Sequence, residues 1–145
     1  MKRKIAVLAV VVAALWLLCV VWLFVGKASR VGCSEGYLVE GQPTGQVTLT
    51  DTGVHMAFIG SYLSDGDRPA GATLWITPPA SSEINGADVS LSVGEGEYVE
   101  GLGRLVLKDV YRPRGERAAF SDRPWVAVCF VPDPGVTPSA GIAQR

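Results

Sequence analysis

The sequence predicts one transmembrane helix followed by a small all-β domain, a sandwich or barrel of about 6–8 short strands. Three observations lead to this fold class. An unbroken apolar run occupies Ile5–Gly26, short β-rich runs separated by Gly, Pro, Asp and Ser follow Cys33, and no long run beyond Cys33 has helical periodicity. The chain is 48% hydrophobic and 19% charged, whereas a soluble domain is about 25% charged. Because the apolar excess lies in one segment, the remainder has room for one ordinary domain.

The apolar run Ile5–Gly26 contains 22 residues and no charged side chain. As a helix it would be about 33 Å long, which is enough to cross a hydrocarbon core of about 30 Å. The alternative is a cleaved signal peptide, because Gly26-Lys27-Ala28 resembles a cleavage site. A signal peptide has an apolar core of roughly 7–15 residues, so the length favours a retained anchor over secretion of the mature domain.

The charges on either side of the apolar run predict its orientation. Residues 2–4 are all basic, and two further basic residues, Lys27 and Arg30, follow the run. The excess of positive charge before the run favours a cytoplasmic N-terminus. We therefore expect residues 1–4 in the cytoplasm, a signal-anchor helix over 5–26, a linker over 27–32 and an extracytoplasmic domain over 33–131. The protein would be a single-pass protein of the cell membrane.

The expected strands combine β-branched and aromatic residues with alternating apolar and polar positions. Trp125–Val131 is apolar on both faces, so it is expected at the centre of a sheet with both sides covered. From Pro132 the chain is rich in Pro, Gly, Ala and Ser, which predicts a disordered tail over residues 132–145. The predicted strands are Gln46–Thr50, Val54–Leu63, Ala72–Thr77, Val89–Val93, Tyr98–Glu100, Arg104–Tyr111 and Trp125–Val131.

Two of the three cysteines lie outside the apolar run, at the start of the β domain (Cys33) and in its last expected strand (Cys129). In an exported domain such a pair is more often a disulfide than two free thiols. A bridge that closes a loop of roughly 95 residues would stabilise the fold by an amount on the order of 4 kcal/mol in the chain-entropy model. We therefore predict a Cys33–Cys129 disulfide.

Sequence motifs do not point to a catalytic or metal centre. Gly32–Gly36 matches G-x-S-x-G, but that nucleophile motif needs a strand before it, a helix after it and a downstream acid and His. His55 is the only histidine and lies ahead of most candidate acids. Asp65 and Asp67 share a loop without the spacing of a calcium site. We expect no catalytic triad, no metal and no cofactor.

The charge distribution is uneven along the β domain. Between Cys33 and Gly103 ten acidic residues accompany one basic residue, Arg68, whereas the loop 112–117 carries Arg112, Arg114 and Arg117. Three guanidinium groups on one loop can grip phosphate or carboxylate groups bidentately, although a solvated loop has the same composition. The acidic body excludes a nucleic-acid-binding profile. These three arginines are the candidate binding residues.

The sequence therefore predicts a non-catalytic binding or accessory domain of a bacterial cell envelope, tethered at the membrane, whose partner is an envelope polymer or a membrane protein. The bacterial source is inferred from residue usage, with nine Arg, four Lys and one Asn. The alternative function is a small carboxylate-dependent envelope hydrolase, which would use acids such as Asp65, Asp67, Glu95 and Glu97. Its support would be a buried, convergent pair of carboxylates.

Overall fold

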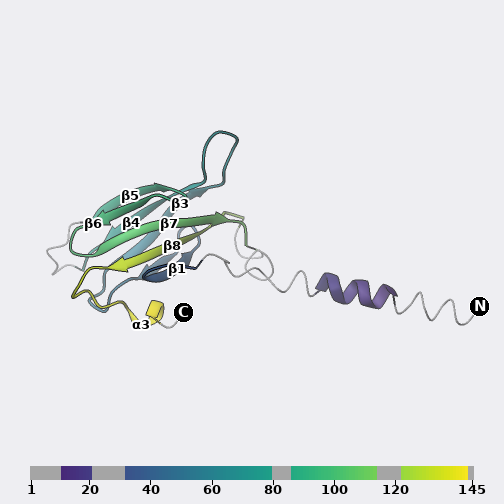
Figure 1. The fold of residues 1–145 in the computed structure, drawn as a ribbon, viewed down its shortest axis with the longest axis horizontal. Coiled ribbons are helices and arrows are strands. Elements are labelled where there is room, and N and C mark those ends of the chain that lie inside the picture. The colour runs from purple at the N-terminus through teal and green to yellow at the C-terminus, as the bar shows by residue number, and fades with distance from the viewer. Residues whose placement is uncertain (1–10, 21–31, 80–85, 114–121, 144–145) are drawn as a thin grey trace, which may run out of the picture. The chain divides into compact units, whose positions relative to one another are not determined.

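The computed structural model describes residues 11–20, 32–79, 86–113 and 122–143, and these include eight strands and a short C-terminal helix (Figure 1). The strands form two antiparallel four-stranded sheets in the orders β1-β8-β7-β6 and β2-β3-β4-β5. The predicted all-β domain is confirmed, as a two-sheet sandwich. The elements are β1 (Tyr37–Gly41), β2 (Gln46–Thr48), β3 (His55–Tyr62), β4 (Gly71–Thr77), β5 (Ala87–Ser92), β6 (Gly96–Val99), β7 (Gly103–Tyr111), β8 (Trp125–Pro132) and α3 (Ala140–Ala143).

The strands follow the chain order around the two sheets, and the chain changes sheet between β1 and β2 and between β5 and β6. At the first change Thr44 N donates to Phe58 O (2.7 Å), and Phe58 N donates to Gly45 O (3.0 Å). At the second, Gly94 N donates to Leu107 O (2.8 Å). The pairing register shifts directly after both acceptor residues, between Phe58 and Gly60 and between Leu107 and Asp109. Such bulges bend a strand, so each sheet bends where the incoming chain joins it.

The core lies between the sheets and is filled by alternate side chains from both. Phe58 and Leu74 from one sheet and Leu105 and Phe130 from the other are fully buried within one hydrophobic cluster. Strand β8 lies between β1 and β7, and its residues 126–130 are all buried. The prediction of a central strand covered on both sides is therefore confirmed.

The observed strands agree with most expected ones and add one more. Tyr37–Gly41 was not expected to form a strand, yet it forms β1 and pairs with β8 along five residues. The expected strand Gln46–Thr50 ends at Thr48, because Thr50 lies next to the turn that leads into β3 and forms an isolated bridge with Pro138. The short run Tyr37–Gly41 is polar at one position and ends in glycine, so only its pairing with β8 identifies it as a strand.

Residues 132–143 are ordered in the structure, which corrects the predicted disordered tail over this range. Ser139 N donates to Leu49 O (2.9 Å), and Ser139 Oγ donates to Thr48 O (2.6 Å). Ile142, in α3, is only 4% exposed and belongs to the core cluster. A composition rich in Pro, Gly and Ala does not predict that this segment is ordered. One buried isoleucine and a few hydrogen bonds are enough to dock it on the domain. Residues 144–145 lie outside the described residues.

Within the predicted anchor, residues 11–20 form a helix whose side chains at positions 11–19 are exposed (purple in Figure 1). Residues 5–10 and 21–26, the N-terminal residues 1–4 and the linker up to residue 31 lie outside the described residues. In the described part of the chain, no helix combines the length and apolar character needed to cross a membrane.

Candidate binding face

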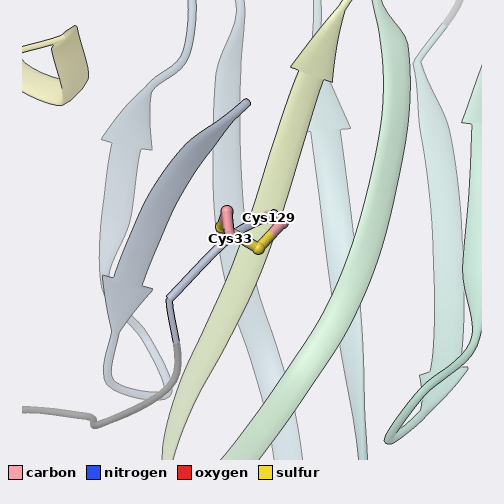
Figure 2. The surroundings of a disulfide bond; sticks show 2 residues. All are labelled: Cys33 and Cys129. Carbon is pink, nitrogen blue, oxygen red and sulfur yellow. A yellow bond between two sulfur atoms is a disulfide. The ribbon is translucent and has the colours of Figure 1, made fainter. Parts of the chain in front are cut away.

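Cys33 and Cys129 form a disulfide with their Cα atoms 5.7 Å apart, so the predicted bridge is confirmed (Figure 2). Cys129 lies in β8 and is 1% exposed. Its neighbours Val128 and Phe130 belong to the core cluster and Cys129 does not, so the bridge lies on the outer face of the sheet. It fastens the chain just before edge strand β1 to an interior strand. Structural disulfides form and persist in oxidising compartments, which indicates an extracytoplasmic domain.

The outer face of the β2-β3-β4-β5 sheet carries a row of side chains across all four strands. Antiparallel pairing aligns Gln46 with Ala57, Ala57 with Trp75 and Trp75 with Asp88. Since side chains alternate between the faces of a strand, these residues point away from the buried Leu74 and its neighbours. We call this surface the Trp75 face, and its residues are Gln46, Thr48, His55, Ala57, Ile59, Thr73, Trp75, Thr77, Asp88 and Ser90.

Two large apolar side chains are exposed on the Trp75 face. Trp75 is 43% exposed and Ile59 is 55% exposed. Ile59 lies at the bulge between Phe58 and Gly60, where it has no partner in the register with β4. Phe58 is buried in the core, so the next residue along the strand points outward. The bulge therefore adds an apolar side chain to the face beside the row that contains Trp75.

Hydrogen-bonding side chains occupy the rows on either side of Trp75. Thr48 Oγ1 and His55 Nδ1 lie 3.1 Å apart in one neighbouring row, and Thr73 Oγ1 and Ser90 Oγ lie 3.2 Å apart in the other. Each hydroxyl can donate one hydrogen bond and accept two, so one mutual bond leaves it able to bond a ligand. The indole thus lies between two rows of hydrogen-bonding side chains.

Three acids of the hydrolase hypothesis lie in connections and the fourth lies in β6, and all four are exposed. Asp65 and Asp67 are in the β3–β4 loop, where the backbone of Asp65 exchanges two hydrogen bonds of 3.1 Å with that of Arg68. Glu95 lies in the β5–β6 connection and Glu97 in β6, and Glu95 Oε2 accepts a hydrogen bond from Ser92 N (2.8 Å). That bond closes a turn. A carboxyl group adapted for acid catalysis is instead usually buried.

Metal binding finds no support in the described part of the chain, where no group of three or more His, Cys, Asp or Glu is placed to hold a metal ion. Among the arginines that were the candidate binding residues, Arg112 follows β7 and is exposed. Arg114 and Arg117 lie outside the described residues. Because only one of the three is among the described residues, their joint role stays a prediction.

The chain matches no family model, no curated protein and no solved structure. Its candidate site therefore depends on the residues and their geometry.

The Trp75 face is not among the sites predicted from the sequence, although the segment Ala72–Thr77 contains the signal. Leu74 and Ile76 mark its buried side, and Thr73 and Thr77 mark its solvent side. Trp75 falls among the threonines, so a large indole stands on the polar side of an amphipathic strand. The other members of the face come from three strands that only the pairing aligns.

Proposed function

We propose that this chain is a non-catalytic binding domain of the bacterial cell envelope, anchored in the membrane, which presents the Trp75 face to its ligand. The exposed indole of Trp75 in the middle of a polar sheet face carries this proposal. A tryptophan buries a large apolar area on contact, and tryptophan is among the residues most enriched at energetically important binding positions. The exposed indole of Trp75 lies on the solvent side of β4, where it does not contribute to the core.

The disulfide supports the extracytoplasmic position of the domain, because the compartment must be oxidising for the bridge to persist. The length of the apolar segment 5–26 supports the membrane anchor. The exposed apolar side chains of residues 11–19 support it as well, since a soluble protein rarely leaves a continuous apolar surface uncovered. The three basic residues at positions 2–4 support a cytoplasmic N-terminus.

Membrane anchoring is tested by carbonate washing of native membranes and by protease added from the outside. We expect the intact chain to remain in the membrane pellet and the protease to remove the β domain. A soluble mature form that begins near Ser29 would show that the apolar segment is a cleaved signal peptide.

The binding role is tested with a photoreactive phenylalanine analogue inserted at Thr77 and, as a matched control, at Arg104. Both side chains are exposed on strands, Thr77 on the Trp75 face and Arg104 on the other sheet. Irradiation of native envelopes should yield adducts from position 77 and few or none from position 104. Equal yields at the two positions, or none at either, would remove the support for this face.

A further inference from the structure

The Trp75 face is small. Four strands, each about 4.8 Å across, are about 19 Å wide, and the seven residues of β4 extend about 24 Å. The sheet face therefore measures at most about 450 Å², whereas a stable protein interface buries about 800 Å² on each partner. A second copy of this chain, or a folded partner protein, would need contacts well beyond the sheet. A linear polymer that lies across the strands needs none.

The chemistry of the face suits a molecule with both weakly apolar faces and many hydroxyl groups. The indole of Trp75 presents a π surface with partial negative charge, on which the C–H groups of a sugar ring can stack. Gln46 lies in the same row, and its amide offers both donors and acceptors. Thr73 and Ser90 lie in the next row toward the β3–β4 loop. Sugar hydroxyls likewise both donate and accept, so they match such groups in pairs.

The charge of the face and of its surroundings selects against polyanions. Among the residues of the Trp75 face, Asp88 is the only carboxylate and there is no Lys or Arg. Two rows from Trp75 toward the β3–β4 loop, Tyr62 pairs with Gly71 and carries the guanidinium of Arg68 over its ring, 3.9 Å from the ring centroid. Residues 33–103, which include this sheet, contain ten acids and one basic residue. Their field repels polymers rich in phosphate or carboxylate groups. An uncharged polymer is not repelled, and the nearly neutral face requires no counter-charge from it.

We propose that the Trp75 face binds an uncharged polysaccharide, with a sugar ring stacked on the indole of Trp75 and neighbouring hydroxyls bonded to the side chains beside it. The inference rests on the proposed binding function and adds the chemical class of the ligand.

The experiment uses the full chain in nanodiscs of uncharged lipid, because sugar-based detergents would compete for the face. The probes are three soluble neutral polysaccharides (a mixed-linkage β-glucan, glycogen and galactomannan) and one polyanion, polygalacturonate. Binding is measured by the shift in electrophoretic mobility in gels that contain each polymer. At least one neutral polysaccharide should retard the protein, and polygalacturonate should not.

The variants separate stacking from general stability. Trp75→Ala should weaken binding about tenfold or more, as expected for a central aromatic contact, with the melting temperature nearly unchanged. Trp75→Phe, which keeps an aromatic face, should restore part of the affinity. Tyr98→Ala is the matched control, because Tyr98 is an exposed aromatic residue on the other sheet, and it should bind as the wild type does.

Four results would overturn the inference. These are no retardation by any neutral polysaccharide, stronger retardation by the polyanion, equal binding by Trp75→Ala, or a concentration-dependent dimer that Trp75→Ala abolishes. Adducts at position 77 without polysaccharide binding would show that the face binds a ligand of another class. If position 77 gives no adducts and no polysaccharide binds, the proposed function and the proposed ligand are both wrong.

Discussion

Replacing both cysteines of the Cys33–Cys129 bridge with serine releases a constraint on the unfolded chain. The two residues are 96 positions apart, and closing a loop of this size is worth about 4.7 kcal/mol in the chain-entropy model. Loss of a native disulfide usually costs about 2–5 kcal/mol, and a domain of this kind has about 5–15 kcal/mol in total. We expect the double variant to lose about 2–5 kcal/mol of unfolding free energy, a range that includes the chain-entropy value.

The loss should be largest locally at β1. This strand is at the edge of its sheet and pairs only with β8, along five residues. The bridge holds the chain four positions before Tyr37, so it also resists fraying of β1 from its N-terminal end. Without it, the amides of β1 should exchange with solvent through local opening, at a lower free energy than amides of the interior strand β4.

The assays are urea unfolding, thermal unfolding and native-state hydrogen exchange of the full chain, all without reductant. The melting temperature should fall by at least about 8 °C, since each kcal/mol shifts it by about 4–8 °C in a domain of this size. Cys19→Ser is the control, because Cys19 is an exposed free thiol. If the double variant and the control unfold at the same urea concentration, the bridge does not stabilise the fold. If the amides of β1 and β4 lose protection equally, the bridge does not stabilise β1 locally.

Three further changes probe the packing, the hydrogen bonding and the charge of the domain. Gly41→Ala should destabilise the fold by about 1–3 kcal/mol in urea unfolding, because an added Cβ would overlap the ring of Phe58; wild-type stability would contradict this packing. The hydrogen bond from Tyr98 Oη to Asp133 Oδ2 (2.5 Å), with desolvation and nearby negative charge, raises the pKa of Tyr98. The hydrogen bond therefore stabilises the fold below the ordinary tyrosine pKa of about 10, and this stabilisation is lost as the pH rises through the raised pKa of Tyr98. Asp133→Ala should lower the pKa of Tyr98 in an ultraviolet titration of tyrosinate. If the loop 112–117 binds an anionic partner, changing its three arginines to serine should leave the melting temperature nearly unchanged and should reduce crosslinking of that partner. Added salt should reduce crosslinking of the wild type as well. Undiminished crosslinking of the variant would show that the loop is a solvated connection.

Much of the β domain follows from local patterns in the sequence. The alternation of Ala72–Thr77 and the doubly apolar run Trp125–Val131 identify strands without any knowledge of their neighbours, because side chains in a strand alternate with a period of two. The cysteine pair could be predicted for a similar reason. Two cysteines in an exported domain leave only one possible intramolecular bridge.

Only the tertiary structure decided which strands pair, and hence which residues share a face. Tyr37–Gly41 is a strand because β8 supplies its partner, and Ile142 is ordered because the core accepts its side chain. The Trp75 face combines four strands whose alignment depends on the pairing register and on the bulge beside Ile59. A period of two tells which residues of one strand point the same way. It contains no information about which strands lie side by side, because that depends on contacts between residues far apart in the chain.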